Sequence, residues 1–214
     1  ETVVEMNVLK RYLPETDAIL TVFSDVTREM ISLAPNLKVI VKPGVGIDNI
    51  DLDYATKSKV IVCNVEGVRG QSVSEHVFFM MLHIARHAWM RNEQEKWRHT
   101  FGVQLARKKI GIVGLGNIGI HVAQIAKGFN MDILVNTRTP DPGICPHIDI
   151  EFVSLGMILK NSDFLVLSLP LVEETRGLIC KRTIGLMKKN CIIVNVSRGP
   201  VVVTDDLYDG IISG

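Results

Sequence analysis

The feature that most constrains the fold is the run Lys109-Ile-Gly-Ile-Val-Gly-Leu-Gly-Asn-Ile-Gly119, in which an apolar strand leads into a glycine-rich turn. Gly114, Gly116 and Gly119 form the pattern G-x-G-x-x-G, and a helix is expected to follow as far as about Phe129. Strand, turn, helix and next strand stand in the right order for a dinucleotide-binding βαβ unit. A glycine turn without a ligand is the simpler alternative.

Each glycine of this pattern meets a different physical requirement. Gly114 permits a tight turn, Gly116 lets the backbone approach a pyrophosphate, and Gly119 lets the helix pack closely on the strand. The helix opens at Asn117 and Ile118, and its free N–H groups carry a partial positive charge that attracts phosphate. We therefore predict that Gly114, Gly116, Asn117, Ile118 and Gly119 bind the cofactor.

Short apolar runs alternate with helical periods along the whole chain, which is typical of an α/β fold with parallel strands. The runs are continuously apolar, as expected for strands with helices on both faces. Helical stretches are expected at 27–33 and 52–56. The predicted strands are Ala18–Phe23, Leu37–Lys42, Val60–Val65, Lys109–Gly114, Met131–Asn136, Phe164–Leu169 and Cys191–Val196.

A long helical stretch from Val73 to about Asn92 joins the two groups of strands. We expect two α/β lobes with parallel sheets: a flavodoxin-like lobe at 1–72 that binds substrate and is incomplete, and a doubly wound Rossmann lobe at 73–214 that binds the dinucleotide. The site is expected in the cleft between the lobes.

The charge balance and the cysteines exclude several classes of function. The 24 Lys and Arg residues nearly cancel the 23 Asp and Glu residues, so nothing indicates a nucleic-acid or membrane partner held by bulk charge. The four cysteines are scattered without metal-ligand spacing, so we expect neither a metal nor a disulfide. No apolar run is long enough to span a membrane, and the protein is predicted to be cytoplasmic.

The end of the second strand of the predicted Rossmann lobe bears on the choice of dinucleotide. NAD-dependent proteins usually place an acidic residue there to bind the ribose 2′-hydroxyl. This chain has Thr137, Arg138 and Thr139, and its next carboxylate is Asp141. Because arginine attracts a 2′-phosphate, we predict that these three residues bind NADP in preference to NAD. In the alternative, Asn136 or Thr137 binds the plain ribose of NAD.

Five motifs together resemble the D-isomer-specific 2-hydroxyacid dehydrogenases, the family that includes glyoxylate/hydroxypyruvate reductases and phosphoglycerate dehydrogenase. They occur in family order and spacing over nearly the whole chain. The matching runs are Pro43-Gly-Val-Gly-Ile-Asp-Asn-Ile-Asp51, Ser72-Val-Ser-Glu-His76, Gly111-Ile-Val-Gly-Leu-Gly-Asn-Ile-Gly119, Leu169-Pro-Leu-Val-Glu-Glu-Thr-Arg-Gly177 and Asn195-Val-Ser-Arg-Gly199.

The resemblance implies roles for residues at four places in the chain. Arg198 matches the catalytic arginine, whose guanidinium binds the substrate carboxylate and polarises the adjacent 2-oxo group. The loop with Val45 and Gly46 supplies backbone N–H groups to that carboxylate. Cofactor contacts are implied for Leu169, Pro170, Thr175, Val196 and Ser197.

The family also carries a glutamate and a histidine several dozen residues beyond the arginine, past Gly214. The resemblance therefore implies that this chain is a fragment lacking both termini, inactive by itself, and that the whole protein is a homodimer. Its implied activity is hydride transfer between NAD(P)H and a small 2-oxo acid such as glyoxylate or hydroxypyruvate. Two alternatives stay open: phosphoglycerate dehydrogenase, and a non-catalytic dinucleotide-sensing protein on the same fold.

Overall fold

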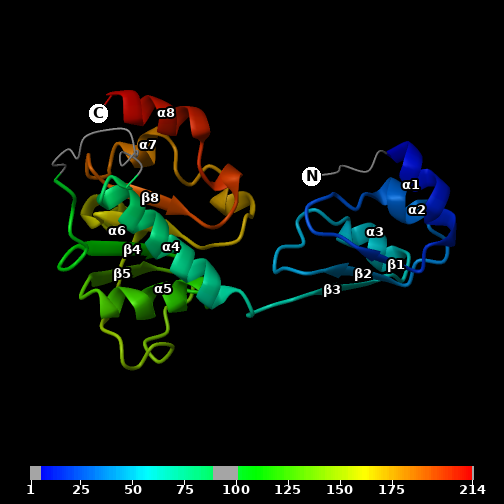
Figure 1. Ribbon diagram of the computed structural model, residues 1–214, viewed down its shortest axis with the longest axis horizontal. Helices are drawn as coiled ribbons and strands as arrows, with labels where there is room; N and C mark the ends of the chain where they lie inside the picture. The colour runs from blue at the N-terminus through cyan, green and yellow to red at the C-terminus, as the bar shows by residue number, and fades with distance from the viewer. Residues whose placement is uncertain (1–5, 89–100, 214) are drawn as a thin grey trace. The chain divides into compact units, whose positions relative to one another are not determined.

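The computed structural model describes residues 6–88 and 101–213, and the chain divides into two compact units, Glu1–Arg69 and Gly70–Gly214 (Figure 1). The sequence prediction placed the division between residues 72 and 73. The difference arises because helix α4 (Gly70–Ala85) begins at Gly70. Residues 89–92, the predicted end of that helix, lie outside the described residues. The assignment of substrate and dinucleotide roles to the two units stays a prediction.

The first unit contains a parallel sheet of three strands in the order β1-β2-β3 (Figure 1). Its helices begin where the sequence supplies a cap: the Thr27 side chain accepts the Met30 N–H, and the Asp51 side chain accepts the Tyr54 N–H. The elements are α1 (Met6–Tyr12), a 3₁₀ helix (Leu13–Glu15), β1 (Ala18–Leu20), α2 (Arg28–Ser32), β2 (Val39–Lys42), α3 (Leu52–Lys57) and β3 (Ile61–Asn64).

One face of this sheet packs against helices and the other does not. Ile40 is fully buried in a core with Met30 and Ala55, whereas Leu20 and Ile61 are 71% and 64% exposed. The expectation that helices cover both faces is therefore wrong for the described residues of the first unit. Its strands are apolar on both faces, and within residues 6–69 only one of those faces contacts helices of this unit.

The second unit is a five-stranded parallel sheet in the order β6-β5-β4-β7-β8, with the first strand in the centre (Figure 1). This order reverses direction between β4 and β7, as in a doubly wound Rossmann sheet, so the predicted fold class is confirmed. Besides α4, the elements are β4 (Lys109–Val113), α5 (Asn117–Gly128), β5 (Asp132–Asn136), β6 (Ile150–Phe152), α6 (Leu155–Asn161), β7 (Phe164–Leu167), 3₁₀ helix Glu173–Thr175, α7 (Lys181–Ile184), β8 (Ile192–Asn195), 3₁₀ helix Gly199–Val201 and α8 (Thr204–Ser213).

Apolar clusters lie on both faces of the second sheet. On one face, α4 and α5 bury Val77, Met81 and Val122 against the strands. On the other, α6 buries Ile158 and Leu159. The central strands β4 and β7 are almost completely buried, which explains their continuous apolar sequences. With both faces covered, the edges of the sheet remain, and β4, β7 and β8 all end at its carboxyl edge.

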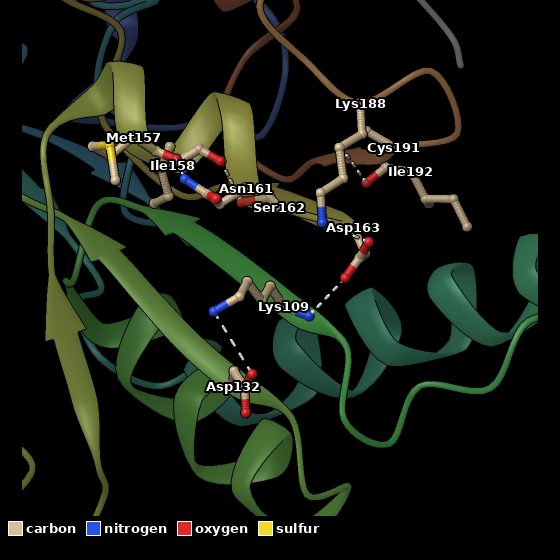
Figure 2. A network of polar contacts seen from close by, with 10 residues as sticks. All are labelled: Lys109, Asp132, Met157, Ile158, Asn161, Ser162, Asp163, Lys188, Cys191 and Ile192. Atoms are coloured by element: carbon tan, nitrogen blue, oxygen red, sulfur yellow. Dashed lines mark hydrogen bonds and ion pairs between the residues drawn. The ribbon is translucent and has the colours of Figure 1, made fainter.

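The opposite, amino edge of the sheet is held by Asp163 (Figure 2). Its Oδ2 accepts the backbone N–H of Lys109 at 2.9 Å, and its Oδ1 pairs with Lys188 Nζ at 2.9 Å. Burial by itself raises the pKa of Asp163, but the hydrogen bonds from Lys188 and Lys109 outweigh it, so the pKa lies below its usual value. Burial, together with the charge of Asp163, raises the pKa of Cys191 to about 12.

Replacing Asp163 with Asn is expected to lower the free energy of unfolding by about 1–2 kcal/mol at pH 7. Because the pKa of Asp163 is depressed in the folded state, the carboxylate contributes its full stability above the unfolded pKa of about 4. That contribution is lost as the pH falls through the lower folded pKa. The difference between wild type and Asp163→Asn in urea unfolding should therefore shrink from pH 6 to pH 3.

The matched control is Asp132→Asn, whose carboxylate lies 3.7 Å from Lys109 Nζ and is 62% exposed (Figure 2). An exposed pair of this kind contributes little, so the expected change is below about 0.5 kcal/mol at every pH. Equal effects of the two substitutions would contradict the assigned role of Asp163.

Candidate functional site

The glycine turn after β4 has the geometry that its sequence predicts. Gly114 has a φ of 98°, and a Cβ added there would lie within 3.0 Å of Ser168 O. A Cβ at Gly119 would lie within 3.0 Å of Gly114 O, so α5 can approach β4 only with glycine at this position. A Cβ at Gly116 would meet no atom within 4 Å. The backbone of Gly116 is thus open to a ligand, and this space fits a pyrophosphate.

The N-terminus of α5 lies next to this open space. No side chain caps it, and its first turn contains no acidic residue, so its first N–H groups can bind an anion. Asn117 and Ile118 offer main-chain N–H groups to such a site. The Asn117 side chain packs against Gly70 of α4, since a Cβ on Gly70 would lie within 3.0 Å of Asn117 Oδ1, and Ile118 packs against the core.

The end of β5 presents a cation and hydroxyl groups. Arg138 and Thr139 are exposed and Thr137 is half-buried, while Asn136 Nδ2 donates to Val153 O at 2.9 Å. Within residues 6–88 and 101–213, no ion pair involves Arg138. The nearby carboxylate of Asp141 accepts the Gly143 N–H at 2.8 Å within its own turn. The end of β5 therefore presents an exposed guanidinium together with hydroxyl groups.

The segments that follow β7 and β8 are joined by a serine. Ser197 Oγ accepts the backbone N–H of Leu169 at 2.9 Å, and Val196 N–H donates to Leu167 O at 3.1 Å. A second serine, Ser168, donates its hydroxyl to Gly114 O at 2.8 Å. These bonds connect the exits of β4, β7 and β8. The sequence analysis did not single out Ser168, because its partner is 54 residues away.

Thr175 holds its own loop together. Its Oγ accepts the Val172 N–H at 2.9 Å and donates to Pro170 O at 2.7 Å, across the 3₁₀ helix Glu173–Thr175. The structure thus brings the predicted residues Leu169, Pro170 and Thr175 into one exit loop. Contact of these three residues with a cofactor stays a prediction.

Arg198 lies three residues after the end of β8 and therefore at the carboxyl edge of the sheet, where the glycine turn also follows β4. Its side chain is exposed, and Nη1 donates to Ser197 O at 3.0 Å. An exposed guanidinium keeps much of its hydration, so the strand can end in a charged residue without the cost of a buried, unpaired charge. The turn is further bonded by Asn195, which the sequence analysis quoted only as part of a motif.

Val45 and Gly46 belong to the loop after β2 in the first unit. Val45 O accepts from Asn64 Nδ2 at 2.9 Å, and Gly44 O accepts the Val65 N–H at 3.1 Å, so the loop is anchored through its carbonyl groups. In the part of the chain that the structure describes, neither the Val45 N–H nor the Gly46 N–H has an acceptor. These two donors can therefore bind an anion such as a carboxylate.

Among the described residues, no group of three or more His, Cys, Asp or Glu side chains lies close enough together to hold a metal ion. No helix in the same ranges has the length and apolar character needed to cross a membrane. The predictions of no metal and of a cytoplasmic location stay predictions.

Comparison with known proteins points to one family over most of the chain. The model of "D-isomer specific 2-hydroxyacid dehydrogenase, NAD binding domain" matches residues 77–214. Glyoxylate reductase of Thermococcus litoralis is 38% identical over 97% of this chain and 66% of its own length. Hydroxypyruvate reductase of Thermotoga maritima is 36% identical over 98% of this chain and 70% of its own length. The chain thus spans about two thirds of these relatives.

One solved structure is similar to this chain in both fold and sequence. D-lactate dehydrogenase of Aquifex aeolicus, complexed with NAD and lactic acid, is 30% identical and has a TM-score of 0.85. The match covers 96% of this chain and 63% of that protein. The second unit is accordingly a domain of the nicotinamide-dinucleotide-binding type.

Proposed function

The chain belongs to the D-isomer-specific 2-hydroxyacid dehydrogenase family, and from this premise we propose that the protein transfers hydride between NADPH and a small 2-oxo acid such as glyoxylate or hydroxypyruvate. The observation that carries the proposal is the position of Arg198 at the same carboxyl edge of the sheet as the open glycine turn. Ligands of open parallel sheets bind outside this edge, near the switch between β4 and β7.

The residues of this chain would act by binding and by polarisation. The Arg198 guanidinium suits a bidentate contact with the substrate carboxylate, and it attracts the electrons of the adjacent 2-oxo group. For Val45 and Gly46 in the first unit, the family resemblance and their backbone N–H groups, which have no acceptor among the described residues, support the proposal that they bind a substrate carboxylate. A bound nicotinamide dinucleotide would supply the hydride. The positive charge favours the reaction because negative charge develops on the oxo oxygen in the transition state.

The preference for NADP is supported by the end of β5. Arg138 is exposed and Thr137 and Thr139 flank it, while the carboxylate of Asp141 is occupied in its own turn. A guanidinium binds a 2′-phosphate through a charge-assisted bond, and an acidic residue would repel that phosphate. We therefore assign the 2′-phosphate to Thr137, Arg138 and Thr139.

A spectrophotometric screen of the full-length natural polypeptide tests the proposed reduction of 2-oxo acids and the proposed preference for NADP. We expect oxidation of NADPH with glyoxylate or hydroxypyruvate, weaker activity with pyruvate and 3-phosphohydroxypyruvate, and a KM for NADPH at least about tenfold below that for NADH. The substitution Arg138→Ala should remove most of this preference by raising the KM for NADPH alone.

Arg182→Ala is the matched control, because Arg182 is an exposed arginine of α7 outside the proposed site. It should leave both KM values unchanged. Tighter use of NADH by the wild type would contradict the NADP assignment. Dinucleotide binding without turnover of any 2-oxo acid would instead favour a sensing protein.

We also propose that the whole protein is a homodimer and that it is cytoplasmic, as the resemblance and the composition imply. On α4, Val77 and Met81 are buried in the core of their own unit, whereas Phe79 and Ile84 are exposed. The apolar side chains available for a partner on this helix are therefore Phe79 and Ile84.

A further inference from the structure

The turn that carries Arg198 is closed by the side chain of Asn195. Its Oδ1 accepts the backbone N–H of Ser197 at 3.0 Å, and its Nδ2 donates to the backbone C=O of Arg198 at 2.9 Å. A carboxamide is suited to this task because it holds one acceptor and one donor in a single plane. One side chain therefore fixes both the entrance and the exit of the Ser197–Arg198 backbone.

The same turn is tied to the rest of the carboxyl edge. Ser197 Oγ accepts the Leu169 N–H at 2.9 Å, and the neighbouring Ser168 donates to Gly114 O at 2.8 Å. Hydrogen bonds thus run from the glycine turn after β4, through the exit of β7, to the turn after β8. Within this series, Asn195 is the side chain that bonds the backbone of Arg198 itself.

The backbone of Arg198 is also bonded by the 3₁₀ helix that follows it. It is extended, with φ of −137° and ψ of 149°, and its C=O also accepts the Val201 N–H at 3.1 Å from the following 3₁₀ helix. Without Asn195 the Arg198 carbonyl would lose the Nδ2 donor, and Ser197 N–H would lose its acceptor. The extended segment could then rotate, and the direction of the guanidinium would change with it.

We propose that Asn195 is a positioning residue for the reduction of 2-oxo acids. It holds the Ser197–Arg198 backbone so that the guanidinium meets the substrate carboxylate in one orientation. The inference rests on the proposed function of Arg198. A two-point contact between planar groups depends on direction as well as distance, and a misplacement of about 1 Å costs about 10²-fold in rate.

Two substitutions of Asn195 test the role of each hydrogen bond. Asn195→Ala is expected to lower kcat/KM for the 2-oxo acid about 10²-fold, with a raised KM, while the Kd for the dinucleotide stays within about threefold. Asn195→Asp keeps the acceptor for Ser197 N–H but has no donor for Arg198 O. Its kcat/KM for the 2-oxo acid should therefore fall by a similar factor. The control is Asn190→Asp, an exposed asparagine before β8, which should behave as wild type.

A double-mutant cycle then asks whether Asn195 acts through Arg198. In an Arg198→Ala background, with added guanidinium to restore measurable activity, Asn195→Ala should cost less than about threefold. A further loss of about 10²-fold in that background would overturn the inference, because the two effects would be independent. Wild-type activity of Asn195→Ala or Asn195→Asp would also overturn the inference. The same holds if the affinity of Asn195→Ala for the dinucleotide falls as much as its kcat/KM.

The outcome for the wild type separates this inference from the proposed function. If the wild type reduces no 2-oxo acid, the proposed function fails and the inference falls with it. If the wild type is active and depends on Arg198 but not on Asn195, only the inference fails.

Discussion

Replacing Arg198 with alanine is expected to lower kcat/KM for 2-oxo acid reduction about 10³-fold in the full-length natural polypeptide. The substitution removes the positive charge of the guanidinium. The substrate carboxylate then loses a charged hydrogen-bond donor, and the negative charge that develops on the oxo oxygen is no longer stabilised by it. Arg198→Lys keeps the charge but lacks the planar fork, so it should recover only about tenfold of the loss. Steady-state kinetics with glyoxylate and hydroxypyruvate provide the measurement.

Two further results show whether the loss of activity comes from the Arg198 side chain alone. The dinucleotide Kd of Arg198→Ala should stay within about threefold of wild type, since a neutral side chain at an exposed site leaves the glycine turn unchanged. Arg182→Ala should keep full activity, because Arg182 is also exposed but lies in α7. Wild-type turnover by Arg198→Ala would refute the proposed function of this arginine.

The second large effect is expected at Gly119. A Cβ there would lie within 3.0 Å of Gly114 O and within 3.4 Å of Ile112, so Gly119→Ala must push α5 away from β4. We expect a loss of about 3 kcal/mol in the free energy of unfolding, at the upper end for an overpacked core site. Dinucleotide binding should also be lost, because the displaced carbonyl belongs to the phosphate turn. Urea unfolding and titration with NADPH measure the two effects.

Gly116→Ala separates stability from binding at the same turn. Its Cβ would meet no protein atom within 4 Å, and its φ of −86° suits alanine. Stability should therefore change by less than about 0.5 kcal/mol. The added methyl would occupy the space proposed for the pyrophosphate, so dinucleotide affinity should fall at least about tenfold. Gly156→Ala in α6 is the control, because its Cβ would also meet no atom within 4 Å. It should lower neither the free energy of unfolding nor the dinucleotide affinity.

A Gly119→Ala protein as stable as Gly116→Ala would disprove the packing argument.

Local sequence patterns predicted most of the second unit correctly. The strand-turn-helix at Lys109–Gly128 follows from contacts between residues only a few positions apart, since Gly114 and Gly119 are five residues from each other. The buried strands β4, β5 and β7 could be predicted because strands buried on both faces are apolar without interruption. The edge strand β8 is only partly buried, and it was predicted from its apolar sequence. Arg198 was identified because a charged residue follows such a strand within a family motif.

Elements with weak local signals were missed. Strand β6 has only three residues, Ile150, Glu151 and Phe152, and it forms by pairing with Ile133–Val135 of β5. Helix α1 (Met6–Tyr12) was also not predicted. The long helix was predicted to begin at Val73, whereas α4 already begins at Gly70. Helix α4 can start there because Gly70 permits the close approach of the Asn117 side chain, a contact that lies 47 positions away along the chain.

The sequence alone determined that this chain contains a dinucleotide-binding βαβ unit and an arginine after an apolar strand, because both depend on backbone requirements met by adjacent residues. Only the tertiary structure decided how these parts are held together. The bonds from Ser168 to Gly114 and from Leu169 to Ser197 join residues 54 and 28 positions apart. Such bonds exist because parallel strands bring their carboxyl ends to one edge whatever the length of chain between them. That edge is where Asn195 holds Arg198 beside the exits of the other strands.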